Sequence, residues 1–457
     1  MKTFAQPLEP VVLLVDSRTR DLPVATLIAH HLRELGAECF LEPLESYRAV
    51  LAAYRPGLII FNHLTAGHLA AYSRRLAKTG VLTAVLPNEG ISYDAEERFF
   101  NSGRHHRDAH IDLFFCWNEP HRQTLLQLGF GGQTRIEVIG VPRFDFYFAP
   151  WSRLYHQPPS QTSPRPRILL CTNFGLAKFH ELPREEGDKF FAAWKDRISI
   201  CRNYRQAIED NYNARRDFFP YLDRLVGAGK FNIVLRPHPR EDAQFYQQWW
   251  HRLPAGQKVQ VTIDSESSIT SLILQCDLEI SCENCTTALE SWIAGKRTVE
   301  LVFARNPMFF TPEHAACNML CDNPDQLVPL VEAQLQNSQP DTLQIARREF
   351  LQKWCNKPDG RSCRHMAETI VAALKLKRRT DWSKLNVADY RRALKLKLSR
   401  SLGFAYHYNP FLSLKSRLFP QRYIIKESSY EKSIKPRDIR EARLRLEKAL
   451  TSPPAKS

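Results

Sequence analysis

The sequence has no apolar run approaching the ~18 residues that a helix needs to cross a lipid bilayer. Its first residues, MKTFAQPLEP, also lack the apolar core of a secretory signal. The 11 cysteines are odd in number and scattered along the chain, which is typical of reduced thiols rather than of a disulfide framework. These absences lead us to expect a cytoplasmic protein.

Common cofactor and phosphate motifs are absent too. The sequence has neither a G-x-x-x-x-G-K-[ST] loop nor a G-x-G-x-x-G after its first predicted strand. It has no carboxylate cluster suggesting bound Mg²⁺, and the C-x-x-C spacing of Cys282 and Cys285 lacks a clear paired zinc knuckle. We therefore expect no metal and no cofactor.

Positive charge is concentrated at one end of the sequence. Residues 375–457 hold 22 Lys and Arg against 7 Asp and Glu, which accounts for the whole net charge of +15. A neutral body with a basic tail predicts contact with an anionic surface, and we expect peripheral binding to the inner leaflet of the cytoplasmic membrane. The alternative is a helical extension that packs on the first domain with its charge solvated.

Apolar runs alternate with amphipathic helical segments along most of the chain. Residues 1–155 contain six runs typical of buried parallel strands, and residues 167–374 repeat the pattern. Residues 156–166 are rich in Pro, Ser and Gln and predict a linker, while residues 375–457 form a basic extension. The predicted fold class is α/β, with two Rossmann-like domains facing across a cleft and a basic C-terminal helical extension.

The stretch NIVLRPHPRED places an arginine and a histidine at the end of a predicted strand. Proline has no N–H and disfavours the helical region for the residue before it, so Arg236 and His238 are both held extended. Ligands of parallel α/β sheets bind at the carboxyl ends of the strands. We interpret Arg236, His238 and Pro239 as one wall of a nucleotide-phosphate site.

The stretch SCENCTTALES predicts a second wall of the same site. It follows an apolar run and opens a helix, where free N–H groups and hydroxyls attract anions. The candidate nucleotide-binding residues are Ser281, Glu283, Asn284, Thr286 and Thr287. Ordinary helix capping is the simpler alternative, but it needs one such residue rather than several.

Three further strand ends carry candidate residues. Glu89, in PNEG, is a candidate general base or nucleophile, although it could instead cap a following helix. Arg143 and Asp145, in GVPRFD, are candidates for an interdomain pair or an acceptor contact. Asn173 and Gly175, in TNFG, are expected to line the phosphate site.

Together, PNEG, GVPRFD, RPHP and SCENCTTALES resemble GT-B glycosyltransferases of bacterial surface carbohydrate biosynthesis, which include HP-motif sialyltransferases and retaining β-Kdo transferases of capsule and lipopolysaccharide. The resemblance implies that His238 contacts the donor phosphate and that Glu89 is the catalytic carboxylate, acting as base or nucleophile. Asn88 stands where the sialyltransferase motif has its first acid. The resemblance also implies transfer of a Kdo-like sugar from a CMP-activated donor to a glycan or lipid-linked acceptor.

Two other functions compete with this interpretation. The first is a CDP-glycerol-type glycerophosphotransferase, in which the same HP motif would bind the CDP-glycerol donor. The second is a basic nucleic-acid-binding protein, which the sequence pI of about 9.3 allows. The neutral body and the lack of recognised nucleic-acid modules disfavour the second, so we expect no nucleic-acid partner.

Overall fold

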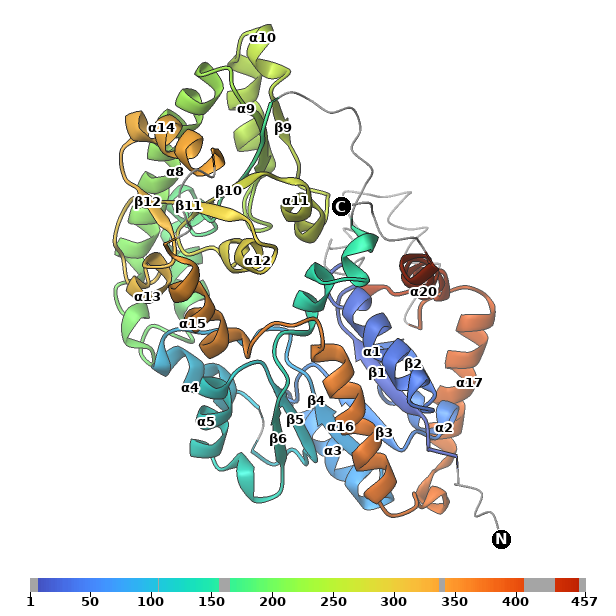
Figure 1. Cartoon of the computed structure of the whole chain (residues 1–457). Helices are drawn as coiled ribbons and strands as arrows, with labels where there is room; N and C mark the ends of the chain where they lie inside the picture. The colour runs from blue at the N-terminus through green and yellow to red at the C-terminus, as the bar shows by residue number, and fades with distance from the viewer. Residues whose placement is uncertain (1–6, 106, 156–164, 337–341, 407–431, 452–457) are drawn as a thin grey trace, which may run out of the picture. The chain divides into compact units, whose positions relative to one another are not determined.

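The computed structural model describes residues 7–105, 107–155, 165–336, 342–406 and 432–451 (Figure 1). The chain divides into two compact units. Unit 1 comprises residues 1–92, 101–145 and 354–457, and unit 2 comprises residues 93–100 and 146–353. Each unit contains one six-stranded sheet with parallel pairing throughout. The predicted α/β fold with two Rossmann-like domains is confirmed.

The sheet of unit 1 is built from the six apolar runs expected in residues 1–155. Its strand order is β2-β1-β3-β4-β5-β6. The strands are β1 (Val11–Val15), β2 (Cys39–Pro43), β3 (Leu58–Phe61), β4 (Leu82–Val85), β5 (Leu113–Cys116) and β6 (Arg135–Val138). Strands β1, β3 and β5 are buried along their whole length, as a parallel sheet covered on both faces requires.

Helices from both ends of the sequence cover the sheet of unit 1. They are α1 (Leu22–Glu34), α2 (Val50–Tyr54), α3 (Gly67–Thr79), α5 (Glu119–Gln127), α16 (Ser362–Leu376), α17 (Val387–Ser401) and α20 (Pro436–Thr451), while α4 (Ala95–Gly103) runs from unit 2 into unit 1. Helices α16 and α20 pack against α1, and α17 packs against α2. The described part of the basic extension is therefore helical and rests on the first domain.

This packing places the domain boundaries differently from the sequence prediction. The second domain was expected to run to residue 374, but unit 2 ends at Lys353. Helix α16 returns to unit 1 because its buried side chains, including Met366 and Ile370, cover α1. Residues 156–164 of the predicted linker lie outside the described residues.

Unit 2 contains a sheet with the strand order β12-β11-β10-β7-β8-β9. Its strands are β7 (Arg167–Cys171), β8 (Asn232–Arg236), β9 (Val261–Ile263), β10 (Leu278–Cys282), β11 (Arg297–Leu301) and β12 (Met319–Cys321). Five of them match predicted strands. The edge strand β12 was missed because it has only three residues and lies in a loop-like stretch with no alternating pattern.

Long and short helices flank the sheet of unit 2. They are α6 (Lys178–Glu181), α7 (Arg184–Phe191), α8 (Tyr204–Gly227), α9 (Ala243–Arg252), α10 (Ala255–Lys258), α11 (Ile269–Gln275), α12 (Thr287–Ile293), α13 (Pro312–Ala315), α14 (Pro324–Leu335) and α15 (Gln344–Cys355). Helix α8 supplies Phe218, Leu222 and Leu225 to the core beneath the sheet. Within the described ranges, no helix is both long and apolar enough to pass through a bilayer.

Candidate functional site

Three neighbouring strands of unit 2 end in polar loops at the same edge of the sheet. Strands β10, β7 and β8 are adjacent, and the loops that follow them span residues 283–286, 172–175 and 237–241. We call these loops together the strand-end site. Ligands of open α/β sheets bind at this edge. The predicted residues Asn173, Gly175, His238, Glu283 and Asn284 all lie in these loops.

Glu241 joins two of the loops, although nothing in the sequence analysis singled it out. Its Oε1 accepts hydrogen bonds from the Thr172 hydroxyl (2.8 Å) and from the Phe174 N–H (2.9 Å). The same oxygen accepts from the backbone N–H of His238 at 3.3 Å, and Oε2 accepts from the Tyr246 hydroxyl. Burial raises the pKa of Glu241 even though these four donors lower it. Glu241 therefore fixes the two loops relative to each other.

The His238 imidazole has a defined donor and acceptor side. The Arg240 N–H donates to its Nδ1 at 3.1 Å, which leaves Nε2 to carry the proton in the neutral ring. Burial, together with the nearby cations Arg240, Arg236 and Lys178, lowers the pKa of His238 to about 4. At neutral pH His238 is therefore an uncharged Nε2–H donor among three cationic side chains.

The other residues of the RPHP stretch have different environments. The Arg236 guanidinium donates from one of its terminal nitrogens to the Asp264 carbonyl oxygen at 2.9 Å. This hydrogen bond holds the backbone directly after β9. Pro239 is exposed. Gly175 lies against this loop: a Cβ added there would be 3.2 Å from the Arg240 Cβ and 3.6 Å from the His238 Nδ1. The loop after β7 thus approaches the His238 ring closely, and that Gly175 lines a phosphate site stays a prediction.

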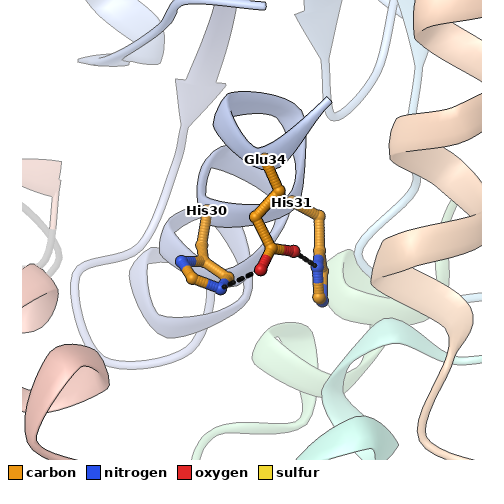
Figure 2. A group of neighbouring side chains, drawn as sticks. All are labelled: His30, His31 and Glu34. Carbon is orange, nitrogen blue, oxygen red and sulfur yellow. Dashed lines mark hydrogen bonds and ion pairs between the residues drawn. The ribbon is translucent and has the colours of Figure 1, made fainter. Parts of the chain in front are cut away.

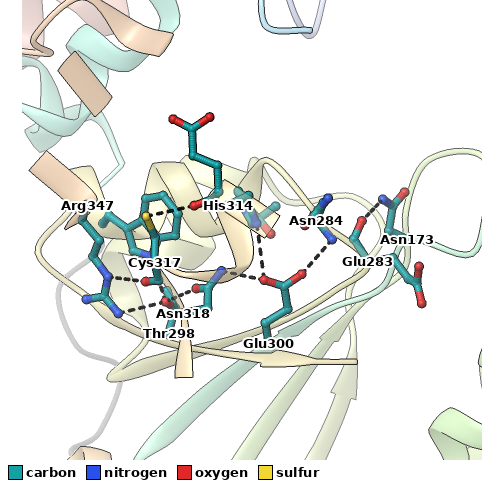
Figure 3. Close-up of polar contacts among 12 residues, drawn as sticks. Asn173, Glu283, Asn284, Thr298, Glu300, His314, Cys317, Asn318 and Arg347 are labelled. Atoms are coloured by element: carbon teal, nitrogen blue, oxygen red, sulfur yellow. Dashed lines mark hydrogen bonds and ion pairs between the residues drawn. The ribbon is translucent and has the colours of Figure 1, made fainter. Parts of the chain in front are cut away.

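The loop after β10 is held in an unusual backbone conformation. Glu283 and Asn284 have positive φ values of 56° and 51°, a region that non-glycine residues rarely adopt. The Asn173 amide donates to the Glu283 carbonyl oxygen at 2.9 Å, and the Glu300 Oε1 accepts from the Asn284 N–H at 3.0 Å (Figure 3). Strain held by surrounding contacts is common at functional sites.

Glu300 belongs to a buried polar cluster beneath this loop. Its Oε2 accepts from the Asn318 amide at 2.6 Å and lies 3.3 Å from the Nδ1 of the fully buried His314 (Figure 3). The Thr298 hydroxyl donates to the Asn318 Oδ1 at 2.6 Å. Sequence reasoning missed this cluster, because a glutamate inside a strand and a histidine after Pro312 share no motif.

The electrostatics of Glu283 suit hydrogen-bond donation. Burial raises the pKa of this carboxyl well above its usual range, and the nearby Glu300 and Asp210 add to the shift. A raised pKa favours the protonated acid, which can donate as well as accept. The buried Asn284 Oδ1 has no hydrogen-bond partner among the described residues. The Glu283 carboxyl and the Asn284 Oδ1 are therefore suited to hydrogen bonds with a nucleoside.

The structure corrects part of the predicted helix-start site. Ser281 lies inside β10 and is completely buried, so its hydroxyl cannot reach a phosphate at the surface. The Thr287 hydroxyl donates to the buried Glu279 Oε1 at 2.8 Å. Thr286, at the N-terminus of α12, is exposed, whereas Thr287 is half-buried.

In unit 1, Glu89 is an exposed carboxylate between two arginines. Its side chain is 73% exposed, with Oε1 3.6 Å from the Arg20 guanidinium and Oε2 4.0 Å from that of Arg143. Gly90 packs on the Trp117 ring, where an added Cβ would come within 2.7 Å of ring carbon atoms. The loop that carries Glu89 is therefore packed against Trp117, the residue directly after β5.

Asp145 has a structural position in unit 1, which differs from the predicted interdomain or acceptor contact. It is buried, and its two oxygens accept from the N–H groups of Ser362 (3.1 Å) and Cys363 (2.8 Å). These N–H groups open α16 and have no partner within the helix. Asp145 therefore caps α16 from a distant part of the chain, while Arg143 stays beside Glu89.

One group of metal-ligating side chains occurs among the described residues: His30, His31 and Glu34 on α1. The Glu34 carboxylate lies 3.3 Å from the His30 Nε2 and 2.9 Å from the His31 Nδ1 (Figure 2). Burial opposes ionisation of Glu34, but both imidazoles lower its pKa. These contacts join three side chains of one helix, in unit 1, outside the strand-end site.

No protein-family model and no curated protein matches the sequence. A crystal structure titled as UDP-N-acetylglucosamine 2-epimerase from Listeria monocytogenes is 12% identical, with a TM-score of 0.51, over 82% of this chain and 99% of that one. The UDP complex of S. aureus MnaA is 11% identical over 82% and 100%, with a TM-score of 0.45. The glycosyltransferase SnogD from Streptomyces nogalater is 13% identical over 81% and 100%, with a TM-score of 0.39.

The Listeria monocytogenes structure shares its fold with this chain, although only 12% of the residues are identical. The chain has a two-domain α/β fold of GT-B type, with one parallel six-stranded sheet in each domain.

Proposed function

We propose that this protein is a metal-independent glycosyltransferase that binds a nucleotide-sugar donor at the strand-end site of unit 2. The observation that carries the proposal is the Arg240 N–H bond to the His238 Nδ1, which leaves an Nε2–H donor beside three basic side chains. Such a group binds a diphosphate or monophosphate oxygen without itself carrying charge. Asn173, Glu283 and Asn284 are the proposed contacts to the nucleoside.

The proposed reaction transfers the sugar to a glycan or lipid-linked acceptor. Departure of the nucleotide leaves an oxocarbenium-like centre, and the His238 N–H stabilises charge on the departing phosphate. Glu89 is the proposed group that deprotonates the acceptor or traps the sugar. The resemblance of the motifs favours a CMP-linked, Kdo-like sugar, while the Listeria monocytogenes structure makes UDP the alternative nucleotide.

Calorimetric titration of the full chain with CMP, CDP and UDP tests the binding site first. One nucleotide should bind, and His238→Ala should weaken it about tenfold, whereas the exposed control His251→Ala should not. Equal loss in both variants, or no binding of any nucleotide, would remove the proposal.

Turnover of sugar donors then separates the enzyme classes. CMP-Kdo, CMP-sialic acid, CDP-glycerol and UDP-N-acetylglucosamine are each incubated with the enzyme, and the products are identified by mass spectrometry and NMR. Consumption of CDP-glycerol alone would replace the sugar transferase with the glycerophosphotransferase. Epimerisation of the UDP-sugar without transfer would replace it with an epimerase.

The basic extension supports a membrane location for the acceptor. Helix α17 buries Ala393 and Leu396 against unit 1, yet its opposite side exposes a row of apolar residues at helical spacing. The exposed fractions are 84% for Val387, 48% for Tyr390, 59% for Leu394 and 54% for Leu398. An apolar row flanked by lysine and arginine is the pattern of helices that lie on anionic bilayers.

Vesicle flotation tests this location. Full-length protein should float with vesicles that contain anionic phospholipid and stay down with zwitterionic vesicles. The double variant Leu394→Ser/Leu398→Ser should lose at least tenfold in vesicle affinity, because each buried leucine contributes roughly 1.5–3 kcal/mol. Val259→Ser, which removes an 82% exposed residue of unit 2, is the matched control. Unchanged flotation of the double variant would exclude α17 as the membrane contact.

A further inference from the structure

A pocket in unit 1 lies where the order of the sheet reverses. The chain places β2 on one side of β1 and β3 to β6 on the other, so β1 and β3 form the switch point. The pocket lies beside these strands and the start of α1, and it encloses about 540 Å³, part of it open to solvent. Small-molecule sites have ~300–1,000 Å³ and favour switch points.

One part of this pocket, which we call its base, is lined by apolar side chains. Leu14 of β1, Phe61 of β3 and Ile28 of α1 line it, and each is almost completely buried. Val24, on the first turn of α1, lines it too and is only partly buried. This base can take a hydrocarbon or aromatic group but offers nothing to a charged one.

Polar and basic groups line the rest of the pocket. Arg20 and Arg143 belong to its lining, against one acidic residue, Asp21. The Asp21 carboxylate is engaged by the Arg20 Nε at 2.8 Å and by the Ser17 N–H at 3.0 Å. Glu89, outside the lining, reaches both guanidinium groups at 3.6 and 4.0 Å. The two arginines can therefore share one anion, and Glu89 occupies that position here.

Two buried polar atoms of the lining are unsatisfied. The Trp117 Nε1–H and the Asn62 Oδ1 have no hydrogen-bond partner among the described residues, and both residues are at least nine-tenths buried. A buried donor without a partner costs roughly 1–3 kcal/mol, which a ligand oxygen would recover. The Arg143 guanidinium lies 5.1 Å from the Trp117 ring, so donor and cation are neighbours.

We infer that this pocket binds an acidic amphiphile, whose anionic group replaces Glu89 between Arg20 and Arg143 while its apolar part enters the base. The inference rests on the proposed function, in which this ligand is the acceptor. Displacement of Glu89 from the two arginines frees the same carboxylate that the proposed reaction needs. A lipid phosphate and an acidic glycoside with an apolar aglycone share this chemistry.

Calorimetric titration of the full chain tests the inference without any donor or turnover. Hexyl phosphate represents the lipid phosphate and phenyl glucuronide the acidic glycoside, with inorganic phosphate and hexanol as the half-ligands. At least one amphiphile should bind at least tenfold more tightly than either half-ligand. If neither amphiphile exceeds the half-ligands, the inference is wrong, even where the nucleotide still binds to unit 2.

Four variants assign the contacts. Arg143→Gln should weaken the amphiphile about tenfold, and Val24→Trp should remove the advantage of the amphiphile over inorganic phosphate. Glu89→Gln should tighten binding severalfold, because the competing internal anion is lost. The control Arg122→Gln, on the exposed side of α5, should change nothing.

Hydrogen exchange on the unmodified chain gives a second measurement that needs no variant. Saturating amphiphile should slow amide exchange in residues 86–90 and 117–118, next to the arginines and Trp117. Protection elsewhere in unit 1, or weaker binding by Glu89→Gln, would contradict the proposed position of the anion.

Discussion

Replacing Glu241 tests whether one carboxylate organises the strand-end site. In Glu241→Ala the Phe174 N–H loses its acceptor and cannot turn away, because it belongs to the backbone beside a fully buried ring. The Thr172 and Tyr246 hydroxyls, both buried, also lose a partner. A buried donor that loses its acceptor costs about 1–3 kcal/mol. The two hydroxyls cost less than the N–H, because they can rotate toward other acceptors. We therefore expect unit 2 to lose about 3 kcal/mol.

Glu241→Gln separates geometry from charge. The amide oxygen can still accept from Phe174 and Thr172, and burial already raises the pKa of the native carboxyl, so loss of the negative charge is a small penalty. We expect a loss of about 1 kcal/mol or less. Glu266→Ala, at an exposed position of the same unit, should stay within about 0.5 kcal/mol of the parent.

Native-state hydrogen exchange is the appropriate assay, because unfolding of a two-unit chain is not one transition. Amides of β7 and β8 report the opening free energy of unit 2 directly. The nucleotide titration of the same variants should show Glu241→Ala binding at least tenfold more weakly. If Glu241→Ala costs no more than Glu266→Ala, or leaves nucleotide affinity intact, Glu241 does not hold the two loops.

Three more predictions follow from the described contacts. Because the pKa of His238 falls from 6.5 to about 4, its contribution to stability is complete above pH 6.5 and is lost as the pH falls toward 4, by at most about 3 kcal/mol. His238→Gln should remove this contribution from the pH dependence of the opening free energy that amide exchange in β8 reports. Gly90→Ala should cost unit 1 about 1–3 kcal/mol, because its methyl group meets the Trp117 ring, and unchanged hydrogen exchange around Trp117 would contradict this. Asp145→Ala should lower the exchange protection of α16 by about 1–2 kcal/mol, whereas Asp145→Asn should retain part of it, and equal effects would show that capping is not its role.

Local sequence patterns were sufficient to predict the strands and the loops that carry the site. Short continuous apolar runs such as Ile233–Leu235 predict buried strands, and the prolines that follow end the hydrogen-bond ladder. That placed Arg236 and His238 at the carboxyl end of β8, where the structure has them. Gly175 followed from the same reasoning for β7.

Contacts between distant residues were not predictable in this way. Ser281 shares a motif with Thr286 but belongs to β10, a strand that is buried along its whole length, so its hydroxyl lies in the core. Glu241 and Glu300 look like ordinary acidic residues until the fold brings donors from other loops to their oxygens. Helix α16 has the same amphipathic pattern whichever unit it covers, so the division of the chain at Lys353 has no local signal.

By itself, the sequence determined the class of fold, the order of every strand except β12 and the loop that holds His238, because hydrophobic periodicity and proline act over a few residues. Only the tertiary structure decided which hydroxyls stay accessible, which carboxylates are buried among donors, that Asp145 caps α16, and that Arg20, Glu89 and Arg143 meet at one pocket. These properties depend on atoms that come together from distant parts of the chain. Burial of those atoms then determines which hydrogen bonds they form and how their pKa values shift.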